Sequence, residues 1–419
     1  MPQKEMHAIE EQLARLRQQI AIINSKYSRP RRSMLSPARC FIEEWSEGEV
    51  VRNQFGEHFQ TERLFASHRP HGSADVGALA ELPKTLLDSL GECQMPAVAP
   101  SRWAFLDIET TGLAGGSGIY AFLIGVGRIT SEGFRVRQFF MREYAEELSV
   151  LAALTTHLEQ FDVLITYNGK SYDQRLLEGR YRATRHNPPF PRLAHLDLLH
   201  SARRLWQLRL DNCRLIELEQ QILGVQREGD LPGELIPFVY FEYLRSREAQ
   251  RLVPIFHHNA LDILTLACLT AIVPAVFGNT DTDSLTRLGV RRGEDLAGVA
   301  RWLRTAGQRE RALGLFKQAV VAGLPDALLF PILWEIAKLE KKLSGPNAAV
   351  PVFFELTTCK NPFRISAFEE LAKYYEHKEK NYALALEFTN HALTIAASAA
   401  LQHRRNRLQS RLGKSSHAV

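Results

Sequence analysis

Two acidic residues, Asp107 and Glu109, stand at the end of an apolar segment that reads W-A-F-L-D-I-E from residue 103, with one residue between them. In a β-strand, residues two apart project from the same face, so both carboxylates point the same way. Like charges at that separation repel unless a cation lies between them, and hard divalent cations prefer carboxylate oxygens. The T-T-G that follows makes the pattern more specific than an isolated D-x-E. The spacing therefore predicts a metal site at a strand end, against the alternative of two surface carboxylates in a turn.

A third acid, Asp173, follows a second apolar segment, V-L-I-T-Y over residues 163–167, across the turn N-G-K-S-Y. This places Asp173 in the first turn of an expected helix. An Asp there can simply favour the positive end of the helix dipole, and taken alone that explanation is sufficient.

A fourth acid, Asp262, ends the stretch H-H-N-A-L-D and leads into the apolar I-L-T-L. If this stretch is helical, His258 lies four residues before Asp262 and shares its face, whereas His257 is rotated away. If the helix begins only near Asn259, irregular backbone brings His257 towards the acid instead. A pair of histidines before such an acid is less ordinary than the acid itself.

Alternating strands and helices are needed to bring these residues together. Apolar and β-branched runs predict the strands, and helical periodicity predicts the helices, so the expected fold class is α/β, with a mixed sheet flanked by helices. The region 212–275 is expected to be mostly helical. The predicted strands are 103–107, 120–129, 134–140, 163–167 and one near 195–199, and the predicted helices are 146–161 and about 172–182.

The order of these motifs resembles that of the ribonuclease H-like DEDD exonucleases of the YprB (MrfB) type. The resemblance covers roughly residues 41–275 and extends more weakly beyond them. Its most specific parts are F-L-D-I-E-T-T-G-L-A-G-G from residue 105, H-N-A-L-D from residue 258, and H-L-D-L-L-H from residue 195 through R-R-L-W. The resemblance implies a ribonuclease H-like fold followed by tetratricopeptide-like repeats. It also implies 3′-to-5′ exonuclease activity on DNA, and a role in DNA repair beside a helicase.

The same resemblance implies the roles of single residues. Two divalent cations, Mg²⁺ or Mn²⁺, are expected on the four carboxylates, with a histidine as general base. Members of the DEDD class carry either His five residues before the last Asp or Tyr four before it; here both positions are His, so His258 is predicted from helix geometry, with His257 as the alternative. Asp197 is expected to be structural. The expected metal ligands are Asp107, Glu109, Asp173 and Asp262, and the residues expected to position the terminal nucleotide are Thr110, Thr111, Gly112 and Asn168.

Four regions follow from the pattern along the chain. Residues 1–39 carry a short heptad repeat and a basic linker, which fits either a dimer or a helix that packs on its own protein. Residues 40–100 form an extension without recognisable chemistry, and residues 101–278 form the nuclease domain. Residues 286–410 predict tetratricopeptide-like repeats, because Ala-rich helices of ordinary length recur there. Such repeats bind a protein partner or serve only as a stabilising cap.

Composition narrows the class of protein. The chain of 419 residues is 45% hydrophobic and 24% charged, which is typical of globular proteins. Both ends are basic, which suits contact with phosphate but equally suits plain solubility. The five cysteines lack the spacing of zinc or disulfide frameworks. No secretion signal or membrane-length apolar run is evident, so a cytoplasmic location without membrane association is expected.

Three alternative functions can be weighed from the residues alone. The same fold supports a structure-selective endonuclease, because a fold does not determine where in a strand cleavage occurs. A repeat-based interaction protein with an inert nuclease domain is disfavoured, since all four carboxylates and a histidine are present. A polymerase proofreading domain is also disfavoured, since no polymerase-sized remainder exists. DNA is the expected substrate, and RNA is not excluded.

Overall fold

The computed structural model describes residues 41–90, 95–112, 118–278 and 281–415. These residues form two compact units. The first comprises the described residues up to Ser201 together with Cys213–Ala275, and the second comprises Ala202–Asn212 with the described residues from Val276 onward. The heptad helix and basic linker predicted over residues 1–39 lie outside the described residues.

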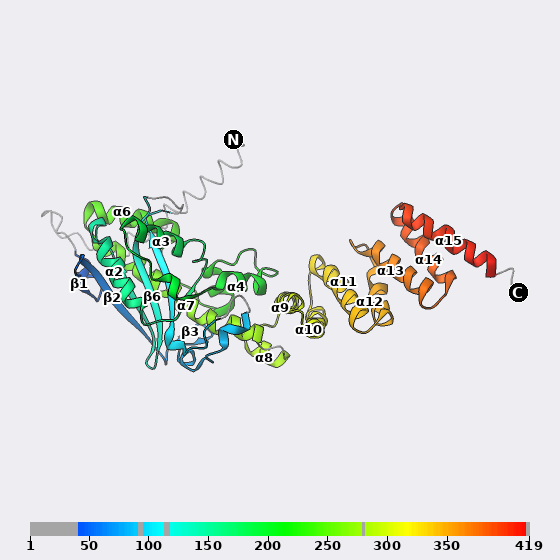
Figure 1. Cartoon of the computed structure of the whole chain (residues 1–419), viewed down its shortest axis with the longest axis horizontal. Helices are drawn as coiled ribbons and strands as arrows, with labels where there is room; N and C mark the ends of the chain where they lie inside the picture. The colour runs from blue at the N-terminus through cyan, green and yellow to red at the C-terminus, as the bar shows by residue number, and fades with distance from the viewer. Residues whose placement is uncertain (1–40, 91–94, 113–117, 279–280, 416–419) are drawn as a thin grey trace, which may run out of the picture. The chain divides into compact units, whose positions relative to one another are not determined.

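A seven-stranded mixed sheet forms the centre of the first unit (Figure 1). Its order is β1-β2-β7-β6-β5-β8-β9; the pairs from β1 to β5 are antiparallel, and β8 and β9 continue parallel to β5. The predicted strands and the α/β class are confirmed. The strands are β1 (Glu49–Asn53), β2 (Gly56–Ala66), β5 (Trp103–Thr110), β6 (Ala121–Thr130), β7 (Gly133–Phe140), β8 (Val163–Thr166) and β9 (Ala194–Asp197).

The segment before residue 100 takes part in this sheet. Strand β2 pairs along β7, from Phe59 opposite Phe140 to Ala66 opposite Gly133, and β1 forms the sheet edge. The sequence had predicted only an extension here, because β2 carries charged residues among its apolar ones. A separate two-stranded hairpin, β3 (Pro70–His71) with β4 (Ala74–Asp75), follows it.

Helices cover both faces of the sheet. On one face, α2 packs against β2 and β7, where His58 bonds Ser149 and Phe139 meets the His157 ring. On the other face α7 crosses β6, where its Ile263 lies against Gly125. The helices of this unit are α2 (Glu147–Leu158), α3 (Asp173–Ala183), α4 (Leu198–Trp206), which runs into the second unit, α5 (Leu215–Leu218), α6 (Ile236–Ser246) and α7 (Val253–Gly278).

Helix α7 is strongly apolar along its length. With the short turn before it, the segment Ala249–Gly278 is long and apolar enough to cross a membrane, which the sequence had not predicted. Its composition has another explanation, because 72% of its most apolar window is buried inside the protein. A helix buried on most of its surface is apolar all round. We therefore describe α7 as the central helix of the fold.

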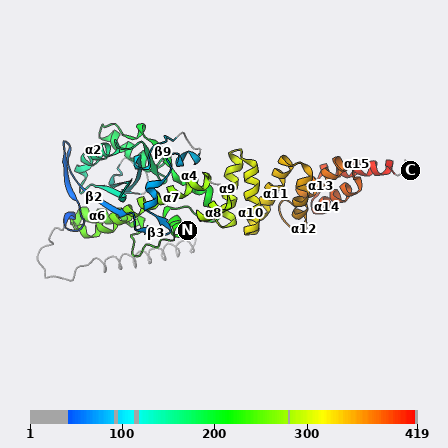
Figure 2. The same cartoon turned by 90° about the horizontal axis from the view of Figure 1, so that it is seen from below.

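The second unit is entirely helical within the residues that the structure describes (Figures 1 and 2). Successive helices pack as antiparallel neighbours, and small buried side chains such as Ala312, Ala367 and Ala392 allow close crossings. The all-helical region predicted from the sequence is confirmed. Its helices are α8 (Thr282–Arg287), α9 (Gly293–Thr305), α10 (Arg309–Ala322), α11 (Asp326–Leu343), α12 (Pro346–Thr358), α13 (Arg364–His377), α14 (Tyr382–Ile395) and α15 (Ala399–Ser415).

Candidate active site

Strand β5 carries the first two acids of the site. Asp107 and Glu109 lie on the same face, two residues apart, near the end of the strand. The register between β5 and β6 shifts between Glu109 and Thr110, and such a bulge bends the strand where it leaves the sheet. Both carboxylates are half-buried, so they are set at the edge of the core with limited access to water.

The turn after β8 brings Asp173 to the same edge. Asn168 has a φ of 65°, a left-handed conformation that Asn tolerates better than most residues. The carboxylate of Asp197 accepts hydrogen bonds from the backbone N–H groups of Asn168, at 2.8 Å, and Lys170, at 3.1 Å. Asp197 is fully buried and therefore holds the turn rather than facing substrate. Asp173 follows as the first residue of α3 and is itself buried.

Helix α7 carries the last acid and both histidines. The helix begins at Val253, before both histidines, so helical spacing applies to each of them. His258 Nε2 lies 3.5 Å from Asp262 Oδ2, one turn further along. His257 instead has its Nδ1 2.8 Å from Arg63 Nη1. Of the two candidates for the base, the structure brings His258 to the carboxylates and turns His257 towards Arg63.

The electrostatics show that the carboxylates share one environment. Burial, followed by the charge of Asp262, raises the pKa of Asp107 from 3.8 to about 7. Burial, followed by the charge of Asp107, raises the pKa of Glu109 and of Asp173 well above their ordinary values. A like charge raises a carboxyl pKa only at short range, so three separate segments meet at one site.

Such a site fits divalent cations. It offers oxygen donors only, besides one imidazole, and the donors repel one another when ionised. Within the described parts of the chain, no three acidic, histidine or cysteine side chains already stand in a coordinating arrangement. The excess of buried negative charge is nevertheless what a bound cation would neutralise. The side chains present are therefore compatible with the expected metals.

An amide chain that the sequence had not predicted holds Asp107. Asn259, fully buried on α7, donates from Nδ2 to Asp107 Oδ2 at 2.8 Å. Gln138 of β7 donates from Nε2 to Asn259 Oδ1, also at 2.8 Å, which fixes the orientation of that amide. In the sheet, Gly125 of β6 lies between Asp107 of β5 and Gln138 of β7, and a Cβ at Gly125 would meet Asn259 Oδ1 at 2.2 Å. The H-N-A-L-D motif contained this residue, but its partner on β7 carries no local signal.

A second missed group surrounds His258 and Asp262. Arg227, almost fully buried, donates from Nη2 to Asp262 Oδ1 at 2.6 Å and from Nη1 to Asp230 Oδ2 at 3.2 Å. His258 Nδ1 lies 2.9 Å from Asp230 Oδ2. Burial alone lowers the pKa of His258, but Asp262, Asp230 and Glu109 together raise it to about 10. In the sequence these residues appear only as the charged loop R-E-G-D, 32 residues before Asp262.

Comparisons with known proteins agree with this geometry. Residues 104–273 match the family model described as the RNase_H superfamily, and this range contains all four carboxylates and both histidines. The chain is 31% identical over 295 residues to the protein YprB of Bacillus subtilis (strain 168), which covers 70% of this chain and 69% of YprB. The chain belongs to the YprB family of the ribonuclease H superfamily. Membership of this superfamily indicates a nuclease.

The four residues predicted to position a nucleotide adjoin the acids along the chain: Thr110, Thr111 and Gly112 follow Glu109, and Asn168 lies five residues before Asp173. The Thr110 hydroxyl donates to the Gly112 carbonyl at 2.7 Å, and the Thr111 hydroxyl accepts from the Tyr120 N–H at 3.0 Å. The Gly112 carbonyl also accepts from the Tyr172 hydroxyl. Both threonine hydroxyls thus bond backbone groups of described residues beside β5 and β6, while Asn168 shapes the turn after β8. Contact with substrate stays a prediction for all four.

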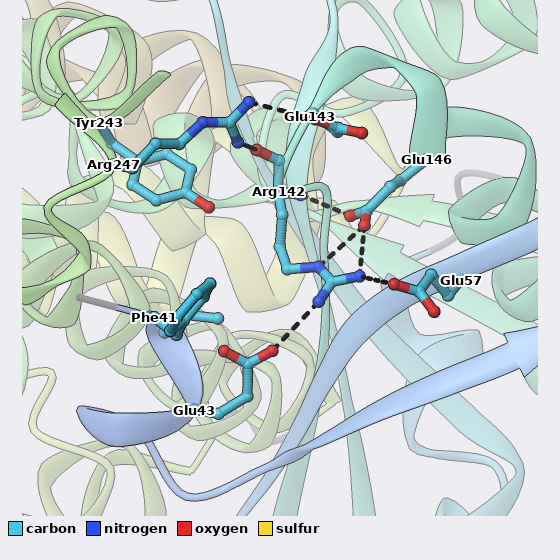
Figure 3. A pocket seen from close by; sticks show the side chains of 9 residues that line it. Phe41, Glu43, Glu57, Arg142, Glu143, Glu146, Tyr243 and Arg247 are labelled. Carbon is cyan, nitrogen blue, oxygen red and sulfur yellow. Dashed lines mark hydrogen bonds and ion pairs between the residues drawn. The ribbon is translucent and has the colours of Figure 1, made fainter. Parts of the chain in front are cut away.

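A pocket of about 330 Å³ lies elsewhere in the same unit (Figure 3). Its wall is an ion-pair cluster in which Arg142 donates to Glu57 at 2.7 Å and to Glu146 Oε1 at 2.8 Å, and also pairs with Glu43. Arg247 pairs with Glu143 across the pocket. None of the predicted site residues lines it. We interpret this cluster as a structural link between β2 and the helices beside it.

Proposed function

We propose that this chain is a metal-dependent 3′-to-5′ exonuclease that hydrolyses the phosphodiester bonds of DNA. One observation carries the proposal: four carboxylates from three distant segments share one buried site, where burial and mutual repulsion raise the pKa of Asp107 and Glu109. Perturbed acids of this kind, gathered in one place, are typical of functional sites.

Each residue then has a role. Asp107, Glu109, Asp173 and Asp262 would hold two divalent cations, Mg²⁺ or Mn²⁺. When bound, such a pair activates water and stabilises the leaving oxygen of an in-line displacement. His258 would take the proton of the attacking water.

The protonation state of His258 sets a condition on this role. The carboxylates around the ring raise its pKa to about 10, and an imidazolium cannot accept a proton. That pKa is raised by Asp262, Asp230 and Glu109. Cations held by Asp262 and Glu109 would offset the charges that keep the imidazole protonated. His258 would then be able to act as a base.

For the helical unit we propose tetratricopeptide-like repeats that bind a partner protein, such as a helicase acting in DNA repair, in the cytoplasm. Support comes from the succession of paired helices with small residues at their crossings. A pull-down tests this assignment. The full chain should retain a purified candidate helicase, and substitution of exposed side chains of α10 or α12 should abolish that retention.

The test of the nuclease is cleavage of end-labelled single- and double-stranded DNA and RNA, and of a closed circle, with Mg²⁺ or Mn²⁺. We expect metal-dependent shortening of linear DNA from its 3′ end, an intact circle, and a loss of about 10³-fold in activity for Asp107→Asn or Asp262→Asn. Asp162→Asn, which removes an exposed carboxylate paired with Arg102, is the matched control and should retain activity.

The other outcomes separate the alternatives. A cut circle would indicate a structure-selective endonuclease. Shortening of RNA alone would show that the substrate is RNA and not DNA. Activity that survives both active-site substitutions would show that the site is assigned wrongly. No cleavage of any substrate would make the helical unit the working part of the protein.

A further inference from the structure

The loop between α5 and α6 places three charged side chains, Glu219, Arg227 and Asp230, in one hydrogen-bonded group that reaches Asp262. It begins with a turn of π-helix, Glu219–Leu223, a rare element that often occurs at functional sites. Glu219 is fully buried and points its carboxylate towards α7. There it accepts a hydrogen bond from the Thr265 hydroxyl at 2.8 Å and lies 3.2 Å from His71 Nε2 of the β3–β4 hairpin.

Glu219 orients the one arginine of this loop. Arg227 donates from Nε to Glu219 Oε2 at 2.6 Å, so the outer edge of its guanidinium faces the site. Its two terminal nitrogens then contact Asp262 and Asp230, one carboxylate each. Because the guanidinium is planar and almost fully buried, it holds those carboxylates in a defined relation to one another.

Asp230 completes the group. One of its oxygens accepts from the Leu231 N–H at 3.0 Å, and the other lies 2.9 Å from His258 Nδ1. The second ring nitrogen, Nε2, stands 3.5 Å from Asp262 Oδ2, which is too far for a direct hydrogen bond. When the ring is neutral, a carboxylate at Nδ1 selects the tautomer that carries its proton there, and Nε2 then presents a lone pair.

We propose that Asp230 is a positioning residue for His258, held in place by Arg227, and that it presents Nε2 of the imidazole to the attacking water. This inference rests on the hydrolytic function proposed above. In the step, the water proton passes to Nε2, the water oxygen bonds to phosphorus, and the bond from phosphorus to the leaving oxygen breaks. Asp230 stays ionised and stabilises the imidazolium. The leaving oxygen takes a proton from solvent and departs as the alcohol, and the imidazolium returns its proton to solvent.

A double-mutant cycle tests whether Asp230 acts through His258. The variants are His258→Ala, Asp230→Asn and the two combined, assayed in Mn²⁺ on the DNA end that the wild type degrades. We expect each single substitution to lower kcat about 10²-fold with KM within about twofold, as for loss of a general base. The double variant should be no slower than His258→Ala, because residues that act as a unit are not additive.

The controls separate positioning from folding. Asp295→Asn removes the carboxylate of another buried Arg–Asp pair, with Arg209, that has no histidine, and should leave kcat unchanged. Calorimetric Mn²⁺ binding should be the same in Asp230→Asn and wild type, a readout that does not depend on turnover. If Asp230→Asn does not fold, Asp230→Glu, which keeps the charge opposite Arg227 but displaces the carboxylate, enters the same cycle.

The outcomes are distinct. A loss in His258→Ala without any loss in Asp230→Asn would overturn the positioning role and leave the nuclease intact. Additive losses in the double variant would also overturn it, because Asp230 would then act independently of His258. No loss of activity in His258→Ala would contradict the assignment of His258 as the base. An inactive wild type would contradict the proposed function and this inference together.

Discussion

Buried acids in the two units of this chain have pKa values that are shifted in opposite directions. In the helical unit, the fully buried carboxylate of Glu376 accepts from Arg407 Nε at 2.9 Å, pairs also with Arg404, and lies 3.7 Å from Arg411. Burial raises its pKa, but Arg407 and Arg404 outweigh burial and hold it below 4.5. In the sheet unit, the pKa of Asp107 rises to about 7.

The difference shows what each group is for. Cations of the chain itself complete the group around Glu376, so that group stabilises the fold. At the site, one arginine and one histidine face several carboxylates, and the remaining repulsion is left for an external cation to relieve. A protein keeps such an unfavourable arrangement where function requires it.

The sharpest test of this contrast is Asp107→Asn. Activity should fall about 10³-fold, equivalent to roughly 4 kcal/mol of transition-state stabilisation. The metal-free variant should be more stable than the metal-free wild type, by about 1–3 kcal/mol, because a neutral amide suffers neither repulsion nor loss of charge solvation. Urea unfolding in chelator measures this, and a destabilised variant would contradict the account.

The pH dependence of that gain has a definite sign. The folded-state pKa of about 7 lies above the ordinary 3.8, so ionised Asp107 destabilises the fold at high pH. The advantage of Asn over Asp should be full above about pH 7 and should disappear as the pH falls towards 4. An advantage that is constant across this range would show that charge is not its cause.

Glu376→Gln should have the opposite effect. The three arginines would lose their shared partner, and since they are partly exposed we expect a loss of about 1–3 kcal/mol. Nuclease activity should not change. Because the pKa of Glu376 is lowered on folding, the difference from wild type should be present at neutral pH and shrink below about 4.5. Urea unfolding from pH 7 to 4 measures it.

Divalent metal should stabilise the sheet unit selectively. In 10 mM Mn²⁺ we expect the midpoint of thermal unfolding to rise by several degrees, since a ligand that binds only the folded state stabilises it by mass action, about 2.7 kcal/mol at 100 times Kd. The rise should be much smaller in Asp107→Asn and unchanged in Glu376→Gln. An equal rise in all three proteins would indicate binding elsewhere.

The smallest expected effect on activity concerns the amide chain. Gln138→Met keeps the volume of the side chain but removes the donor that orients Asn259, so Asp107 loses a fixed partner. We expect kcat to fall about threefold to tenfold, the equivalent of roughly 1 kcal/mol. Stability should fall by about 1–3 kcal/mol, because Asn259 Oδ1 and the Phe256 carbonyl both lose a buried donor. A matched substitution, Gln160→Met, changes a glutamine on the surface and should have no effect.

Much of the fold could be predicted because its signals are local. The runs around Phe105, Leu164 and Val126 are apolar enough to be strands wherever they occur, and each is buried in the structure. Strand β2 was missed because exposed positions along it carry charges such as Glu62 and Arg63, which hide the alternation. The apolar length of α7 was also missed, because its buried polar residues interrupt the pattern.

For the candidate site too, some features could be predicted from local sequence and others depend on the tertiary structure. Sequence alone determined which side chains can carry the chemistry, since an acid at a strand end or helix start is recognisable from its neighbours. Tertiary structure decided that α7 begins early enough to bring His258, rather than His257, to the carboxylates. It also decided that Gln138 and Arg227 support the site, because those contacts join segments more than 30 residues apart. The chain can encode such partners only through folding, which places them side by side.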